Sequence, residues 1–144
     1  MEKYKFITAK TKSDLVRFYP VMKELRLELS YNDYLTIYEK AHAADGYEIV
    51  GLESGAEIMA ILGYRVLTDY VHGRHLYIDD LVSTSKQRSK GFGAKLLAHA
   101  EEVARELNCK SLRLSTGIDN EGGQKFYERE GWELKSVVYK KKFT

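Results

Sequence analysis

The sequence predicts an α/β (α+β) fold, because a strand, a helix and a second strand follow one another in the second half of the chain. Residues 76–82 read Leu-Tyr-Ile-Asp-Asp-Leu-Val, a mostly apolar run typical of a strand. A turn with Gly91 and Gly93 follows, and apolar residues then recur at helical spacing from Ala94 to Leu107. The alternating segment Ser111–Ser115 predicts a strand parallel to the first, so the three elements would form a right-handed crossover.

Two helices are predicted in the first half of the chain. Ser13-Asp14 is expected to cap a helix that runs from Leu15 to Leu25 or Leu29. Pro20 would kink or restart this helix, because proline lacks the backbone N–H and clashes with the preceding turn. Ser30 is expected to cap a second helical segment, Asn32–Ala43.

Strands are predicted before and after these helices. Tyr4–Thr8 opens the chain as a strand, and Tyr47–Leu52 and Glu57–Leu67 are separated by Ser54-Gly55, a hairpin signal. Val71-His72-Gly73 is the next turn, and it leads to the strand that ends before the glycine turn. The sequence contains no visible repeat or linker.

The glycine turn before the long helix predicts an anion site. A helix N-terminus carries free backbone N–H groups and the positive end of the helix dipole, and glycines let the backbone approach a phosphate closely. A Walker loop is excluded because Gly93 is followed by Ala94-Lys95-Leu96. A dinucleotide fingerprint is excluded as well, because Leu96 stands where its third glycine belongs and Ser115 and Thr116 stand where its acid belongs.

A second motif makes this pattern far more specific. Arg88-Ser89-Lys90-Gly91-Phe92-Gly93 is followed at a distance by Asn120, then Phe126-Tyr127, then Gly131-Trp132. In both motifs the chain resembles the GCN5-related N-acetyltransferases (GNAT family), strongly from Leu76 to Trp132 and weakly before Tyr47. The resemblance implies one domain over residues 1–144, with a central mixed twisted sheet of six to seven strands and about four helices. The aromatic after Gly131 would open the last strand.

The resemblance also implies how a co-substrate, acetyl-CoA, is bound. Backbone groups at the end of the strand would pair with the pantetheine arm, amides of the glycine turn would hold the pyrophosphate, and Asn120 would contact the cofactor from the other side. The expected cofactor-binding residues are Leu81, Val82, Ser83, Arg88, Ser89, Lys90, Gly91, Phe92, Gly93, Ala94, Asn120 and Tyr127.

The implied chemistry is the attack of a primary amine on the acetyl carbonyl, with no metal required. Tyr127 matches the family tyrosine that protonates the CoA sulfur, and a phenol with a pKa of ~10 is still a proton donor at neutral pH. Asp79 is the expected general base, acting directly or through water. Neighbours on a strand face opposite ways, so Asp79 and Asp80 are expected on opposite faces. An equally weighted alternative is an ion pair of one or both aspartates with an arginine such as Arg65 or Arg74.

Other side chains are given structural interpretations. His75 lies near the start of its strand and is expected at the surface. The single Cys109 cannot form an internal disulfide and is interpreted as a small buried filler. Gly123 stands where the family usually has Ala, and with Gly122 it weakens its helix by ~1 kcal/mol per glycine.

Composition limits the classes of partner. The charge is 23 minus 21, or +2, and Lys140-Lys141-Lys142 is the only basic run, so we expect no nucleic acid and no membrane partner. No apolar run approaches the ~18 residues of a membrane span, and the start lacks the apolar stretch of a signal peptide. We therefore expect a cytoplasmic protein. The oligomeric state is open, with a homodimer as one option.

These observations predict an N-acetyltransferase that transfers acetyl from acetyl-CoA to a primary amine of a small molecule or of a lysine side chain. An alternative is a regulatory module that binds acyl-CoA without chemistry. The acceptor amine, and whether longer acyl groups are used, cannot be read from the sequence, because loops and helices before Tyr47 would wall the acceptor pocket.

Overall fold

The computed structural model describes residues 3–87 and 90–144. Arg88 and Ser89, both expected to bind the cofactor, lie outside these residues. The chain divides into two compact units, Met1–Arg113 and Leu114–Thr144, so one domain over residues 1–144 stays a prediction. None of the described helices is both long and apolar enough to span a membrane.

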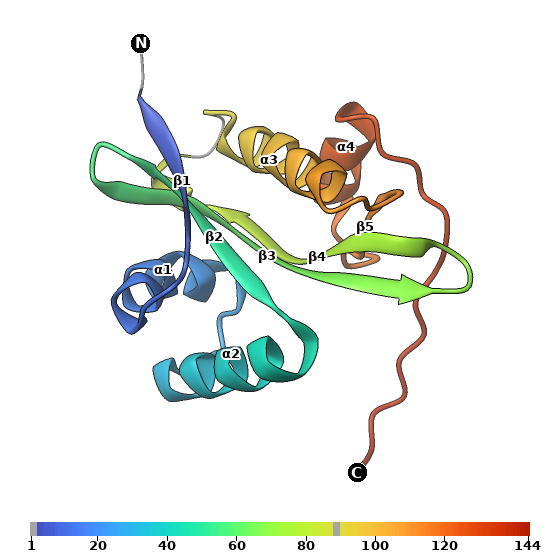
Figure 1. The fold of residues 1–144 in the computed structure, drawn as a ribbon, viewed down its shortest axis with the longest axis horizontal. Coiled ribbons are helices and arrows are strands. Elements are labelled where there is room, and N and C mark those ends of the chain that lie inside the picture. The colour runs from blue at the N-terminus through green and yellow to red at the C-terminus, as the bar shows by residue number, and fades with distance from the viewer. Residues whose placement is uncertain (1–2, 88–89) are drawn as a thin grey trace. The chain divides into compact units, whose positions relative to one another are not determined.

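A mixed sheet carries the fold (Figure 1). Its first four strands are joined by antiparallel pairing in chain order. The fifth strand lies beside the fourth, and two backbone bonds there, Lys110 N to Arg74 O and Leu76 N to Ser111 O, advance along both strands in the same direction, as in a parallel pair. The strands are β1 (Tyr4–Thr8), β2 (Glu48–Ser54), β3 (Glu57–Asp69), β4 (Gly73–Ser83) and β5 (Leu112–Leu114).

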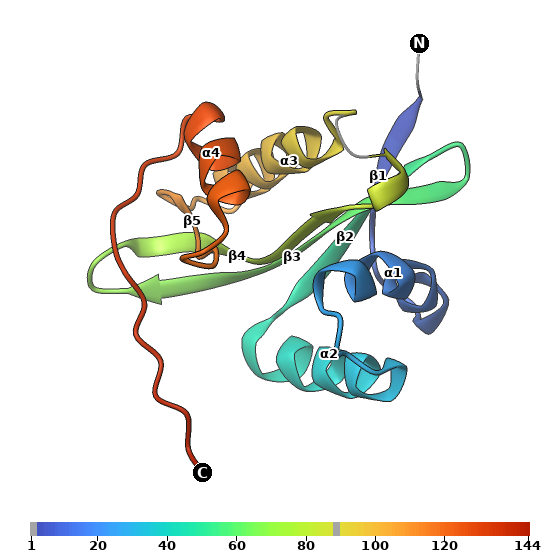
Figure 2. The ribbon, with the colours of Figure 1, turned by 180° about the vertical axis from the view of Figure 1, so that it is seen from behind.

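Helices cover both faces of the sheet in the first unit. The two views show α1 and α2 on one face and α3 on the other (Figures 1 and 2). This confirms the predicted α+β class, and it confirms that strand, helix and parallel strand follow one another from β4 to β5. The helices are α1 (Lys12–Leu25), α2 (Tyr31–Asp45), the 3-10 turn η1 (Ser85–Gln87), α3 (Phe92–Glu106) and α4 (Glu121–Arg129).

The first helix starts and continues differently from the prediction. Thr11 is the N-cap, and its hydroxyl accepts from the N–H of Asp14, whose carboxylate accepts from the N–H of Thr11 in return. This reciprocal capping box satisfies two N–H groups, so the expected cap at Ser13-Asp14 was wrong. The helix also continues through Pro20 without restarting. For α2, the predicted cap at Ser30 is confirmed.

The predicted last strand is absent from the structure. Residues 132–144 contain no strand, and the described residues form a sheet of five strands in place of six to seven. A strand is stabilised by a hydrogen-bonded partner and a buried face. Neither is present here, since the apolar residues of this segment are exposed and none of residues 133–144 pairs with a described strand. These apolar residues are Leu134, Val137, Val138 and Tyr139.

The main core lies between α1, α2 and the sheet. Phe18 of α1 is fully buried beside Ile49 and Ile61 of the sheet. A Cβ on Gly51 would lie 2.5 Å from the Phe18 ring, so only glycine lets this ring reach the strand. On the other face, the predicted apolar stripe of α3 is confirmed by the burial of residues such as Leu96 and Ala100.

Candidate active site

A β-bulge in β4 places two carboxylates at one cavity. Gly63 of β3 pairs with Asp80, but the next residue, Tyr64, pairs with Ile78, so Asp79 is an extra residue in β4. The strict alternation expected for this strand is therefore broken. Asp79 and Asp80 both line the same cavity, so the expectation that they face opposite ways was wrong.

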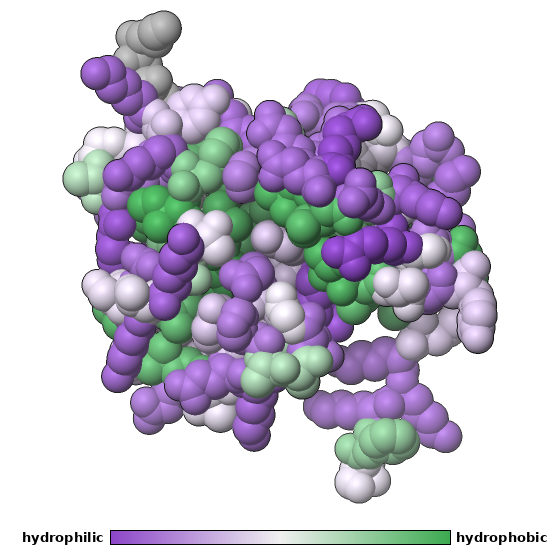
Figure 3. Space-filling view, in the orientation of Figure 1, coloured by the Kyte–Doolittle hydropathy of each residue, from purple (hydrophilic) through white to green (hydrophobic). Residues whose placement is uncertain are grey.

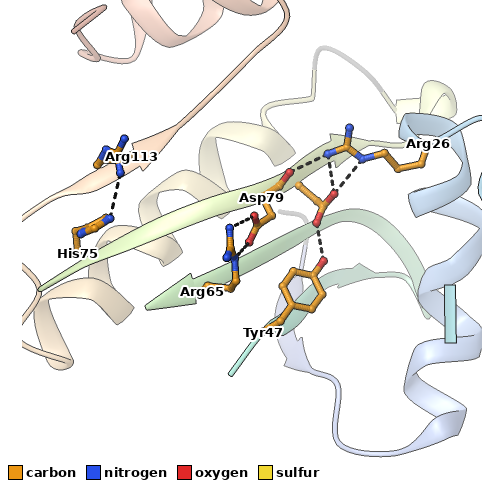
Figure 4. Close-up of polar contacts among 7 residues, drawn as sticks. Arg26, Tyr47, Arg65, His75, Asp79 and Arg113 are labelled. Carbon is orange, nitrogen blue, oxygen red and sulfur yellow. Dashed lines mark hydrogen bonds and ion pairs between the residues drawn. The ribbon is translucent and has the colours of Figure 1, made fainter. Parts of the chain in front are cut away.

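Asp79 forms a bidentate ion pair with Arg65 of the neighbouring strand (Figure 4). Nε and Nη2 of Arg65 each donate at 2.9 Å, one to each carboxylate oxygen. The bond to Asp79 is the main cause that raises the pKa of Arg65 above its ordinary value. The structure thus shows the ion pair that the sequence offered as an alternative for Asp79, while its role as a base stays a prediction.

Asp80 is held from two sides by side chains that the sequence did not single out. The Tyr47 hydroxyl donates to its Oδ2 at 2.6 Å, while Nε and Nη2 of Arg26 donate to its Oδ1 at 3.1 and 2.8 Å. In Figure 4, dashed lines from Arg26 and Tyr47 lead to one unlabelled carboxylate, which is that of Asp80. Burial, and then the charge of Asp80, raises the pKa of Tyr47 well above its ordinary value, so Tyr47 remains a proton donor.

Glycine at position 63 makes room for this network. A Cβ there would overlap the Tyr47 hydroxyl and would lie 2.7 Å from Oδ2 of Asp80. The only sequence signal was the pair of aspartates in an apolar strand. Arg26, Tyr47 and Gly63 lie 54, 33 and 17 residues before Asp80, and no motif joins them.

Arg26, Tyr47, Arg65, Asp79 and Asp80 line a cavity of about 680 Å³, whose other lining residues come from α1, α2, the segment between these helices and the sheet. Its walls are mostly apolar and aromatic, which is typical of small-molecule sites. Figure 3 shows apolar side chains at the surface on the side where α1 and α2 lie. The wall residues include Met22, Leu29, Tyr34, Ile37, Tyr38 and Ile49.

Among the described residues, pairing at the end of β4 is found along one edge. Leu81, Val82 and Ser83 pair with β3. The bonds that join β4 to the β5 segment involve Arg74 and Leu76, at the other end of the strand. The second edge at residues 81–83 is therefore the one to which an amide-bearing arm could add as a further strand.

Glu24 of α1, which the sequence did not single out, anchors the chain just after this edge. Its carboxylate accepts from the Thr84 hydroxyl at 2.9 Å and from the Ser85 N–H at 2.7 Å. Thr84 is buried, and its N–H donates to Met59 O of β3. The segment that leads into the glycine turn is thus fixed to both α1 and β3.

The start of α3 has the features predicted for an anion site. Gly91 is the N-cap with φ 78° and no side-chain cap, a conformation that glycine adopts without strain. The N–H of Lys95 donates to Gly91 O, the first bond of the helix. The N–H groups of Phe92, Gly93 and Ala94, which precede this first bond, are the ones that a helix leaves unpaired.

In the second unit, Asn120 and Tyr127 lie on the helix predicted to carry them. Asn120 is the N-cap of α4: its Oδ1 accepts from Gly123 N at 3.0 Å, and its Nδ2 donates to Thr116 Oγ1 at 2.9 Å. Tyr127 is half-buried between Phe126 and Trp132, and burial raises the pKa of its phenol. Tyr127 is therefore a protonated donor at neutral pH.

The expectation of a surface His75 was wrong, because this side chain is fully buried. Its Nδ1 lies 2.9 Å from Gly73 O, so this nitrogen carries the proton, and its Nε2 lies 3.2 Å from Nη1 of Arg113 (Figure 4). The hairpin also brings Asp69 and His72 close, with their ligand atoms and that of His75 within 4.8 Å of one another. Since Arg113 donates to Nε2, we assign this group a structural role.

Comparison with known proteins identifies the family. The sequence model of the acetyltransferase (GNAT) family matches residues 10–132. The uncharacterized N-acetyltransferase YhdJ of Bacillus subtilis (strain 168) is 33% identical over 132 residues, which cover 91% of this chain and 93% of the relative. A thialysine N-epsilon-acetyltransferase of Bos taurus is 26% identical over 135 residues, 78% of this chain and 79% of the relative.

A solved structure shows the same fold. The aminoglycoside N-acetyltransferase AAC(6')-Iy, in complex with CoA, matches with a TM-score of 0.86 and 17% identity, covering 99% of this chain and 96% of that chain. At this identity the likeness establishes the fold alone. The chain belongs to the acetyltransferase (GNAT) family and is an acetyl-CoA-dependent N-acetyltransferase, as the paired motifs predicted.

Proposed function

We propose that the protein transfers the acetyl group of acetyl-CoA to a primary amine of a small molecule or side chain by direct attack, and that the amine enters the cavity beside Asp79 and Asp80. The observation that carries this proposal is the cavity itself, in which the carboxylates of Asp79 and Asp80 stand among mostly apolar walls. A carboxylate stabilises an ammonium group and accepts its proton. A relative named for thialysine, itself an amine, supports this class of acceptor.

Asp79 is the proposed general base. A carboxylate can accept about four hydrogen bonds. Asp79 accepts two from Arg65, whereas Asp80 accepts two from Arg26 and one from Tyr47. Asp79 thus keeps more capacity to accept the proton of an incoming amine, directly or through water.

Acetyl-CoA supplies the thioester carbonyl and the leaving thiolate. The amine nitrogen forms the new C–N bond, the C–S bond breaks, Asp79 takes the proton from nitrogen, and the Tyr127 hydroxyl gives a proton to sulfur. The residues proposed to hold the co-substrate are the edge Leu81–Ser83, the amides from Lys90 to Ala94, and Asn120.

The test measures thiol release from acetyl-CoA with a panel of primary amines, alongside the affinity for CoA. We expect turnover with amines, a kcat/KM at least tenfold lower in Asp79→Asn, and CoA affinity within about twofold of the wild type, since base catalysis contributes about 10²–10⁴. Glu57→Gln, an exposed acid at the start of β3, serves as the matched control and should behave as the wild type.

Two results would contradict the proposal. Turnover of Asp79→Asn at the wild-type rate would remove Asp79 from the reaction. Binding of CoA without thiol release on any primary amine would rule out the amine acceptor.

A further inference from the structure

The cavity carries an excess of negative charge. Its lining contains five acids and two arginines, which gives a formal charge of −3. The acids are Glu28, Asp33, Asp45, Asp79 and Asp80. Among the described lining residues there is no lysine. The cavity therefore attracts cations and repels anions before any contact is made.

Both arginines of the cavity are already engaged by its inner carboxylates. Arg65 pairs with Asp79 and Arg26 pairs with Asp80, and the two carboxylate side chains are only 23% and 12% exposed. An anionic group on a ligand would have to share an arginine whose charge a carboxylate already balances, so it would gain little attraction there. It would also lie close to that carboxylate, which repels it.

Three acids of the lining have no such arginine, and all three are exposed. Glu28 follows α1, Asp33 lies in the first turn of α2, and Asp45 is the last residue of α2. None of the ion pairs found among the described residues involves these carboxylates. They are free to meet a second positive charge on a ligand.

The cavity wall next to these acids is apolar and reaches the surface. Leu27 is 71% exposed and Ile37 is 56% exposed, and both line the cavity. Exposed apolar side chains that continue an apolar cavity are typical of a site that covers an apolar ligand body.

We infer that the acceptor is a cationic amine with an apolar alkyl or aryl body and no carboxylate or phosphonate, and that a second ammonium group improves it. The inference rests on the proposed function for its acceptor site. The reacting amine lies at Asp79, the apolar body contacts the wall that includes Leu29 and Ile37, and the far end of the ligand lies toward Glu28 and Asp33.

Three amines with the same six-carbon chain differ only in the group at the end opposite the reacting amine, so they test the preference for that group. These are 1,6-diaminohexane, hexylamine and 6-aminohexanoate, which end in an ammonium, a methyl and a carboxylate group. We expect kcat/KM to fall in that order, with at least a tenfold difference between the diamine and the amino acid. Calorimetry of the three amines against the CoA-bound protein should give the same order of affinity.

Variants that remove the charges of Glu28 and Asp33 test whether these acids cause the preference for a second ammonium group. Each unit charge about 10 Å from the ligand in water changes affinity about twofold. The double variant Glu28→Gln/Asp33→Asn should therefore reduce the preference for diamine over hexylamine about fourfold. Glu39→Gln, an exposed acid on α2 outside this cavity, should leave the preference unchanged.

The outcomes separate this inference from the proposed function. A kcat/KM for 6-aminohexanoate equal to or higher than that for 1,6-diaminohexane would overturn the inference. The thiol release seen in that case would still uphold the proposed function. No thiol release with any amine, together with the expected order of affinity, would overturn the function and uphold the inference. No binding of any of the three amines would overturn the inference.

Discussion

The cavity beside Asp79 and Asp80 and the glycine turn lie in the same unit but are built by different means. The cavity depends on side chains that come from α1, α2, β2, β3 and β4. The turn depends on backbone N–H groups of one short segment, in which Gly91 adopts φ 78°. A contiguous backbone site is fixed by local sequence, whereas a site made of distant side chains is fixed only when the whole sheet has formed.

The contrast between a backbone site for CoA and a side-chain site at the cavity would weaken most if one side chain, Tyr127, proved essential for the use of CoA. Tyr127→Phe removes only the hydroxyl, and loss of this proposed general acid should lower kcat about 100-fold. CoA affinity and the urea midpoint should remain near the wild-type values, because the ring stays between Phe126 and Trp132. Stopped-flow thiol release measures kcat, calorimetry measures CoA affinity, and urea unfolding gives the midpoint.

The same variant has a pH signature. Burial raises the pKa of Tyr127 above its ordinary value of 10, so the hydroxyl keeps its proton up to at least that pH. The wild-type rate should rise with pH as the amine loses its proton and should show no fall below about pH 10. An alkaline fall near pH 8 that disappears in Tyr127→Phe would contradict the raised pKa.

Among the residues around the cavity, we expect the largest effect on stability and on kcat/KM at Gly63. A Cβ there would overlap the Tyr47 hydroxyl, so Gly63→Ala should break the bond from Tyr47 to Asp80 and cost about 1–3 kcal/mol of stability, as overpacking does. The kcat/KM for the amine should fall at least tenfold, while CoA affinity stays within twofold.

Tyr47→Phe is the matched variant, because it removes the same hydrogen bond without adding an atom. It should also lower kcat/KM, by a smaller factor than Gly63→Ala, and should lower the free energy of unfolding by about 1 kcal/mol. Wild-type stability and activity in Gly63→Ala would show that the carboxylate network does not need the space.

In the glycine turn before α3, the change that corresponds to Gly63→Ala in the cavity is Gly91→Ala. An L-residue at φ 78° costs about 1–2 kcal/mol, so the variant should bind CoA about tenfold more weakly if the turn relaxes away from the bound geometry. Gly55→Ala, in the turn between β2 and β3 at φ 60°, imposes the same strain far along the chain from this turn. It should cost similar stability and leave CoA affinity unchanged; equal CoA affinities in the two variants would contradict a backbone phosphate site.

The sequence predicted the parts of the molecule that local rules control. The order of strands and helices as far as α4, the cap at Ser30 and the helix after Gly91 are confirmed, because capping residues, glycines and apolar spacing act over a few positions. The cap at Thr11 was missed although it is local, because the neighbouring Ser13 and Asp14 are equally good capping residues.

The cavity could not be predicted in the same way. The bulge at Asp79 shows only in the pairing of two strands, and it moves a carboxylate to the face where the alternation of β4 does not place it. Burial of His75 depends on Gly73 and Arg113, and the latter lies 38 residues away. Pairing of Arg26 with Asp80 joins residues 54 apart, and one sequence contains no local signal for such contacts.

Two adjacent glycines of α4 show the same limit of local sequence. Helix propensity predicts the same effect for an alanine at either position, but the two positions have different surroundings in the structure. A Cβ on Gly122 would meet no atom within 4 Å, whereas a Cβ on Gly123 would overlap Nδ2 of Asn120 and lie 2.8 Å from its Cγ. Gly122→Ala should therefore raise the free energy of unfolding by about 0.5–1 kcal/mol through helix propensity. Gly123→Ala should lower it by about 1 kcal/mol, because the gain in propensity is outweighed by loss of the Asn120 cap. Urea unfolding followed by the fluorescence of Trp132 measures both, and stabilisation by Gly123→Ala would show that the Asn120 side chain is free to move aside.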